Sequence, residues 1–213
     1  NPDSIIVESG ADSFRIYEMF MGPLEAVKPW VTKDIVGICR FLDRVWRIGL
    51  KPVSDEAPSK ELLRTTHKTI KKVSEDIEAL RFNTAISALM IMANEMSKVE
   101  SLHVGAWEPF LQCLAPFAPH IAEECWQTLG REGSISHATW PVFDPSLVVD
   151  DEVQIVVQVN GKVRARFAAA KGTPKEALEA QALADGNVGK FIEGKTIRKV
   201  IVIPDRIVNI VAN

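Results

Sequence analysis

The chain has few cysteines and no long apolar run. Its 213 residues include three cysteines, Cys39, Cys113 and Cys125, an odd number without a paired C-x-x-C spacing. This argues against a disulfide framework or a zinc finger and favours a reducing, cytoplasmic compartment. No apolar stretch reaches the roughly 18 residues that a membrane-spanning helix needs, so we expect no contact with a membrane.

Motifs that carry chemistry are also missing. The sequence has no glycine-rich phosphate loop. Its histidines are scattered without metal-ligand spacing, at His67, His103, His120 and His137. Glu123 and Glu124 fall in a predicted first helical turn, where the helix dipole favours carboxylates, so they need no catalytic explanation. We therefore expect no catalytic residue, no metal site and no cofactor site in these residues.

The net charge of −3 hides an asymmetry along the chain. Residues 1–150 hold 15 lysines and arginines against 21 aspartates and glutamates, whereas residues 151–213 hold 10 against 7. A basic segment joined to an acidic body often meets nucleic acid, although a surplus of this size is weak support by itself.

The pattern up to residue 140 is helical. Apolar residues recur at intervals of three and four, as in an amphipathic helix packed on a core. This periodicity predicts helices over 33–49, 59–80, 82–98, 104–117 and 119–130. Proline and glycine separate them, so we expect an antiparallel helix bundle over 1–140.

The pattern changes beyond this bundle. Residues 141–152, with two prolines and several acids, are expected to form a linker. From 153 the apolar period is two rather than 3.6, with two strands, helices near 173–184 and 186–193, and two final strands. The predicted fold class is α+β, a helix bundle followed by a small ββααββ domain over 153–213. Since the chain opens on Asn1 and not on methionine, we expect a piece of a longer protein.

The hairpin around Asn160-Gly161 raises a question of register. A two-residue turn would place Val159 opposite Lys162 and mix apolar side chains with cations along the whole ladder. Because side chains alternate with period two, only an odd-numbered loop restores the pattern. We therefore predict a three-residue loop, Val159-Asn160-Gly161, with Gly161 in the left-handed position.

This register places three cations on one face of the hairpin. It pairs Val157 with Val163, Ile155 with Ala165, and Val153 with Phe167. Lys162, Arg164 and Arg166 then share the opposite face, about 6.8 Å apart, close to the spacing of phosphates along a nucleic-acid strand. Arg198 and Lys199 are expected as their neighbours. The alternative is an ordinary solvated strand face.

Basic residues also line one face of two predicted helices, and this face is distinct from the apolar face. The helix over 33–49 carries Arg40, Arg44 and Arg47, and the helix over 59–80 carries Arg64, Lys68 and Lys71. Solvated faces with partners one turn away, such as Arg40–Asp43 and Lys71–Glu75, are the alternative. Together with the hairpin, the two basic faces favour contact with RNA phosphates. Because there is no row of aromatic side chains for stacking bases, structured RNA is favoured over a single strand.

Five stretches together resemble a known family. They are YEMFMGPLEAVKPW (17–30), RFLDRVW (40–46), FNTAISALM (82–90), LAPFAPHIAEECW (114–126) and VQVNGKVRAR (157–166). They resemble leucyl-tRNA synthetase of the bacterial type, and the resemblance covers essentially the whole chain. LAPFAPHIAEECW is also similar to stretches of the valyl and isoleucyl enzymes, whereas MGPLE combined with VNGKVRAR resembles the leucyl enzyme specifically.

The resemblance implies a function for the parent protein. It implies a class I ligase that joins leucine to its tRNA with ATP and magnesium, and places this chain after the catalytic core, as a helical anticodon-binding-type domain and a C-terminal domain. Nothing in the chain matches the family's HIGH and KMSKS motifs or its editing domain, so the chain itself is expected to be inactive. In this family the helical domain braces the inside of the tRNA and the C-terminal domain reaches its elbow and long variable arm.

The expected partners are therefore leucine tRNA and the catalytic domain of the same parent chain, in a monomeric cytoplasmic protein. Two other functions remain open. One is a non-catalytic helical scaffold that packs on another protein domain, and the other is a general RNA-binding module without preference among tRNAs.

Overall fold

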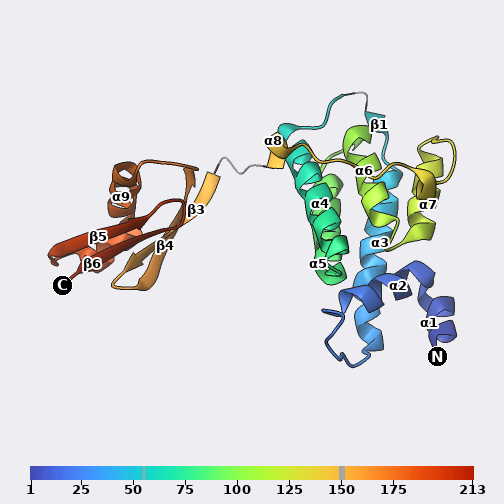
Figure 1. The fold of residues 1–213 in the computed structure, drawn as a ribbon, viewed down its shortest axis with the longest axis horizontal. Coiled ribbons are helices and arrows are strands. Elements are labelled where there is room, and N and C mark those ends of the chain that lie inside the picture. Colours follow the sequence, from blue (N-terminus) through green and yellow to red (C-terminus); the bar gives the residue numbers. More distant parts are fainter. Residues whose placement is uncertain (55, 149–151) are drawn as a thin grey trace. The chain divides into compact units, whose positions relative to one another are not determined.

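The computed structural model describes residues 1–54, 56–148 and 152–213, with the backbone alone for Thr32 and Glu152. The chain divides into two compact units, Asn1–Val148 and Val149–Asn213 (Figure 1). Each has its own cluster of buried apolar side chains. Helix and sheet are thus combined in one chain, as the sequence predicts.

The first unit is built from helices. Their bounds are α1 Pro2–Ser9, α2 Ala11–Phe20, α3 Ile35–Gly49, α4 Lys60–Glu78, α5 Phe82–Lys98, α6 Val104–Leu114, α7 Pro119–Thr128 and α8 Pro145–Val148, with short 3-10 turns η1 Thr32–Asp34 and η2 Ile135–His137. Short strands β1 (Val53–Ser54) and β2 (Leu102–His103) pair in parallel. Local signals set several starts: Asn1 caps α1 through Asp3 N–H, and Ser59 caps α4 through Leu62 N–H.

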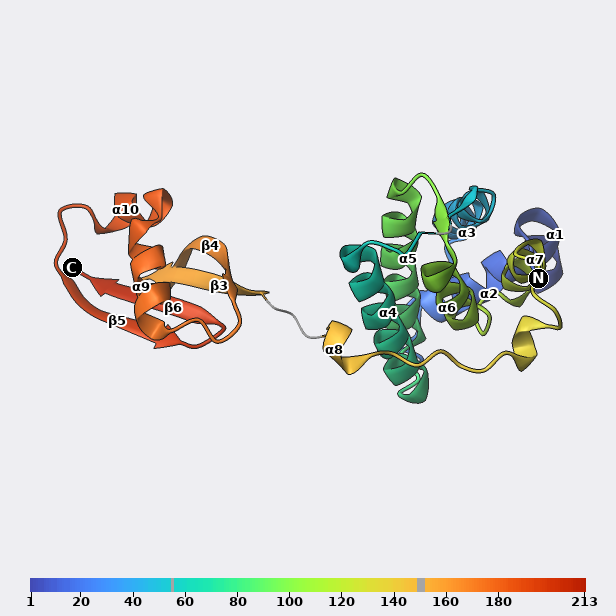
Figure 2. The same ribbon diagram turned by 90° about the horizontal axis from the view of Figure 1, so that it is seen from above.

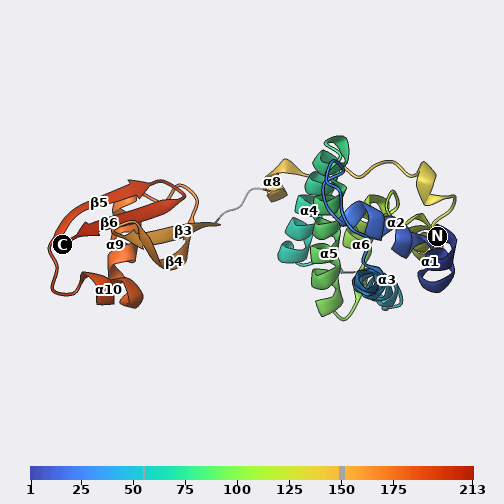
Figure 3. The ribbon, with the colours of Figure 1, turned by 90° about the horizontal axis from the view of Figure 1, so that it is seen from below.

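The core of the first unit gathers around α5. This helix packs against α2, α3, α4 and α6, and its buried face includes Leu89 and Met92 (Figures 2 and 3). Trp107 and Phe110 from α6 stack in the same cluster with ring centroids 5.3 Å apart. The apolar stripes that predict these helices are therefore the surfaces that bury each other.

Part of the predicted linker is attached to the first unit. Residues 145–148 form α8, which packs against α4. Just before it, Trp140 Nε1 donates to Ser74 Oγ at 2.8 Å, and the Asp144 N–H donates to His67 Nδ1 at 2.9 Å. Residues 141–148 of the predicted linker therefore belong to the first unit, because side chains of α4 hold this segment. Residues 149–151 of that linker lie outside the described residues.

The second unit is a four-stranded sheet with two helices. The elements are β3 Glu152–Val159, β4 Lys162–Ala170, α9 Lys175–Ala184, α10 Gly186–Ile192, β5 Ile197–Ile203 and β6 Ile207–Ala212. The strand order is β4-β3-β6-β5, with β3 and β6 parallel at the centre and both outer pairs antiparallel. Both helices lie on one face of the sheet, where Leu178 and Val188 are buried with Ile155 and Val208.

Candidate nucleic-acid interface

The hairpin closes differently from the prediction. Val159 pairs with Lys162, so the turn is the two-residue Asn160-Gly161, with φ of 50° and 77°. The register then shifts, because Arg164 is an extra residue between Val163, opposite Gln158, and Ala165, opposite Val157. The predicted three-residue loop is wrong. The extra residue demanded by the alternation exists, but it is a bulge inside β4, which residue counting does not locate.

Long-range hydrogen bonds hold the tight turn. The Asn160 side chain donates to Ala212 O at 2.7 Å and accepts from Ala212 N–H at 3.0 Å. The Gly161 N–H donates to Asn209 Oδ1 at 3.2 Å. These bonds tie the tip of the hairpin to β6, so Asn160 and Gly161 have a structural role.

The three hairpin cations do not share a face. Arg164 is half-buried, with its guanidinium 3.8 Å from the ring centroid of Phe191 on α10, so it points to the helix side. Arg166 is exposed and stands opposite Val156 on the other face. Lys162 is exposed at the tip, opposite the buried Val159. The predicted single row of cations is therefore wrong.

Arg198 and Lys199 are not neighbours of these cations either. They lie on β5, which is at the opposite edge of the sheet from β4. Arg198 sits at a second register shift and donates from Nε to Asn213 Oδ1 at 2.7 Å, whereas Lys199 is exposed opposite Val211. The prediction placed them beside the hairpin because strand order cannot be read from a linear pattern.

The cations of α3 have separate surroundings. Arg40 is exposed, and Arg47 forms an ion pair of 2.8 Å with Asp43 one turn earlier. Arg44 donates to the Asn94 side chain of α5. The side chains of Arg40 and Arg47 are exposed to solvent, whereas Arg44 forms a hydrogen bond between α3 and α5.

The cations of α4 are more enclosed. Arg64 and Lys68 are half-buried. Lys71 lies 3.9 Å from Glu75 and 5.8 Å from the ring centroid of Phe143. Since α5 packs against both α3 and α4, a third helix is in contact with each of the two basic helices. The contact expected between Lys71 and Glu75 is present, whereas Asp43 pairs with Arg47 and not with Arg40.

Charged residues outside the predicted sites form hydrogen bonds with the ends of helices. Lys51 Nζ donates to the carbonyls of Met96 and Ser97, each at 3.0 Å, and to that of Val99, at the end of α5. Burial lowers the pKa of this ammonium from its usual value. Arg15 donates to Pro116 O at 2.8 Å, just beyond α6. Such pairings join residues far apart in sequence, so no local signal announces them.

Two acidic residues accept hydrogen bonds at the start of a helix and in a loop. Asp12 accepts hydrogen bonds from Ile121 N–H at 2.8 Å and from His120 Nδ1 at 2.8 Å, at the beginning of α7. Glu123 accepts from Ser134 Oγ at 2.7 Å and from Ile135 N–H at 3.1 Å. The hydrogen bond from Ser134 is the largest influence that lowers the pKa of Glu123. Glu123 thus anchors the loop that leads into η2.

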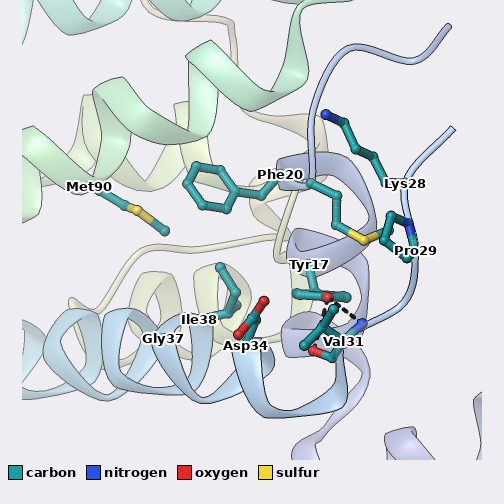
Figure 4. Close-up of a pocket in the computed structure, with 10 residues that line it drawn as sticks. Tyr17, Phe20, Lys28, Pro29, Val31, Asp34, Gly37, Ile38 and Met90 are labelled. Atoms are coloured by element: carbon teal, nitrogen blue, oxygen red, sulfur yellow. Dashed lines mark hydrogen bonds between the residues drawn. The ribbon is translucent and has the colours of Figure 1, made fainter. Parts of the chain in front are cut away.

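A pocket of about 500 Å³ opens in the first unit between α2, α3 and α5 (Figure 4). Its walls are mostly apolar, from Phe20, Ile38 and Met90, with the charged groups of Lys28 and Asp34 among them. One wall is held by Tyr17, whose hydroxyl accepts from the Val31 N–H and donates to the Val31 carbonyl, both at 3.1 Å. Such a lining suits an apolar contact with one or two polar anchors.

Three further features concern metal binding, thiol chemistry and membrane insertion. Within the described ranges, no three His, Cys, Asp or Glu side chains are placed to hold a metal ion. The cysteines are free thiols, and burial raises the pKa of Cys113 to about 12 and that of Cys125 to about 11. Of the helices described, none has both the length and the apolar character to cross a bilayer.

Comparison with known proteins defines the class. Residues 59–179, which run from α4 into α9, match the family described as the anticodon-binding domain of tRNA ligase. This match spans more than half of the chain, and the chain belongs to that family.

A solved structure identifies which tRNA ligase the chain resembles. The chain is similar over its full length to LeuRS of Agrobacterium radiobacter K84, agnB2, solved as a ternary complex with tRNA and LeuAMS. The TM-score is 0.79 and the sequence identity 27%, and the chain spans 30% of that protein's length. The resemblance to leucyl-tRNA synthetase predicted from the sequence is thereby confirmed.

Proposed function

We propose that this chain is a tRNA-binding part of a leucyl-tRNA synthetase, the ATP-dependent ligase that attaches leucine to its tRNA. One observation carries the proposal: the chain shares its fold from end to end with a LeuRS that was solved together with tRNA. The family match over residues 59–179 supports the same function, because that family is described as the anticodon-binding domain of tRNA ligase.

The two units have different tasks in this proposal. The helical unit braces the tRNA body, and the sheet unit contacts the elbow and the variable arm. Exposed cations such as Arg40, Arg47 and Arg166 contact phosphates, which position an RNA without reading its sequence. ATP, magnesium and the activation of leucine belong to the catalytic domain of the parent, and the parent is a cytoplasmic monomer.

Binding of leucine tRNA to the purified chain tests the proposal. Measured by filter binding at two salt concentrations, the association constant should fall steeply with salt, because each neutralised phosphate adds about 0.9 to the logarithmic slope for a duplex. A tRNA without a long variable arm should bind more weakly. Equal affinity for both tRNAs would instead indicate a general RNA-binding module.

The absence of catalysis is tested separately. The chain should give no leucine-dependent pyrophosphate exchange above background, since ATP chemistry is assigned to the catalytic domain. Exchange by the purified chain would contradict this division of labour.

A protein scaffold is the second candidate function, favoured by the pocket in the first unit. Exposed apolar side chains adjoin its lining residues in sequence, Val27 next to Lys28 and Val36 next to Gly37. A protein that docks there through apolar contacts would bind with little dependence on salt. Salt dependence therefore separates the two functions.

A further inference from the structure

The sheet of the second unit has one covered and one uncovered face. On the covered face, α9 packs against β5 and β6, and α10 packs against β3 and β4. We name the other side the open face. Its positions are Val163, Arg166 and Ala168 on β4; Gln154, Val156 and Gln158 on β3; Ile207, Asn209 and Val211 on β6; and Lys199, Ile201 and Ile203 on β5.

One row across the open face is mostly aliphatic. Arg166, Val156, Ile207 and Ile203 form one row across all four strands, since each pairs with the next. Ile201 and Ile203 are neighbours on one face of β5 and are 41% and 47% exposed, whereas Val163, 48% exposed on β4, is separated from them by Gln158 and Asn209. A monomeric domain rarely leaves contiguous aliphatic side chains this open to water unless the surface meets a partner.

The named open-face positions carry charge of one sign, whereas the helix side carries both. The ionisable residues at the open-face positions named above are both cations, Arg166 on β4 and Lys199 on β5. The helix side carries both signs: Glu176 and Glu179 on α9 and Asp185 and Glu193 flanking α10 lie there together with Lys175, Lys190 and Arg164. The open face thus combines one mostly aliphatic row with a cation on each edge strand, which is complementary to an anionic partner.

The spacing of the two cations indicates the shape of that partner. Arg166 and Lys199 are three strands apart and two rows apart, which places their Cα atoms about 20 Å from each other, given about 4.8 Å between strands and 3.4 Å per residue. This is too wide for adjacent phosphates of one strand and suits a folded RNA with two backbone segments. No aromatic residue occupies these positions, so stacking of splayed single-stranded bases is disfavoured.

We propose that the open face is the surface through which the second unit binds structured RNA, with Arg166 and Lys199 on phosphates and Ile201 and Ile203 against the ribose and base surface between them. This inference rests on the proposed tRNA-binding function and assigns a surface to it. A second copy of the chain fits less well, because two open faces would bring cations together without a carboxylate at the positions named above.

Matched substitutions in the full chain test the assignment. Arg166→Ala and Lys199→Ala should each weaken binding of leucine tRNA by about threefold to tenfold and lower the salt slope by about one. Ile201→Thr and Ile203→Thr keep the β-branched shape and should weaken binding by about threefold with an unchanged salt slope. Lys175→Ala and Lys190→Ala, exposed cations of α9 and α10, remove the same charge from the helix side and should leave affinity and slope unaltered.

Each outcome is decisive. Circular dichroism melting verifies that every variant is folded. If the unmodified chain binds leucine tRNA and the open-face variants bind equally well, the assignment is overturned while the proposed function stands. If the unmodified chain shows no salt-sensitive binding of tRNA, the proposed function fails as well. If the isoleucine substitutions dissociate a dimer in sedimentation and leave RNA affinity alone, the open face is an interface between copies, and the assignment is again overturned.

Discussion

A single buried carboxylate links two helices of the first unit. The Asp76 side chain is fully buried near the end of α4 and accepts hydrogen bonds from Arg81 Nε at 2.8 Å and from Thr84 Oγ1 at 2.6 Å, and it also pairs with Lys72. Burial alone would raise the pKa of this carboxyl, but the hydrogen bonds from Lys72, Thr84 and Arg81 outweigh burial, so the pKa is lowered. The ionised form is therefore the one that stabilises the fold.

Asp76→Asn should lower the free energy of unfolding by about 2–3 kcal/mol at pH 7, because a buried charge network loses its centre. A carboxyl whose pKa is depressed in the folded state contributes stability above its unfolded pKa, about 3.9, and loses it as pH falls through the folded pKa. The difference between wild type and variant should thus shrink below about pH 4. Urea denaturation at pH 7 and pH 3 measures both effects.

Glu75 provides the matched control for Asp76. Its carboxylate lies 3.9 Å from Lys71 on an exposed helix face. Glu75→Gln should cost less than about 1 kcal/mol, as surface ion pairs generally do. Equal losses in the two variants would contradict the role given to burial at Asp76.

At the scale of elements, the β3–β4 hairpin shows how a correct rule led to a wrong register. Alternation requires one extra residue between the two strands, and the prediction placed it in the turn. The structure places it at Arg164, while Asn160 and Gly161 adopt the positive φ angles of a tight turn. The difference moves Val163 to the open face and Arg164 to Phe191.

Two substitutions separate the contributions of Asn160. Asn160→Gly keeps the positive φ but loses both bonds to Ala212, which should cost about 1–2 kcal/mol. Asn160→Ala loses the same bonds and adds backbone strain, so its cost should be about 1 kcal/mol greater. Thermal denaturation of the second unit measures both. If the glycine variant were as stable as wild type, the bonds to Ala212 would not be what holds the turn.

At the scale of the whole molecule, the two buried clusters suggest two cooperative folding units. The aromatic residues offer a way to observe them separately, because all five tryptophans and the single tyrosine precede residue 149. Intrinsic fluorescence therefore reports on the first unit alone, whereas far-ultraviolet circular dichroism reports on both.

Val208→Ala tests this independence. Val208 is fully buried in the second unit, so its truncation should cost that unit about 1–3 kcal/mol. The fluorescence midpoint in urea should stay unchanged while the circular dichroism transition broadens toward lower urea. Leu89→Ala, in the buried face of α5, should do the reverse and shift the fluorescence midpoint. A fluorescence shift in the Val208 variant would show that the two units unfold together.

The sequence by itself determined the local elements and the family. The helix predicted over 82–98 has those limits in α5, and the other predicted helices differ from the observed ones by a few residues at their ends. Helix limits can be predicted from the sequence because apolar periodicity and helix caps depend on residues within one or two turns of each other. The quoted stretches were also enough to indicate leucyl-tRNA synthetase, because a motif is a property of the linear chain.

Only the tertiary structure decided which residues share a surface. Strand order separated Arg166 from Lys199 by the width of the sheet, a bulge turned Arg164 to the helix side, and α5 packed against both basic helices. Alternation tells which residues differ in face, but it does not tell which strand is the neighbour or where an extra residue sits. Those choices depend on contacts between residues distant in sequence, such as Asn160 with Ala212, and such contacts exist only once the chain has folded.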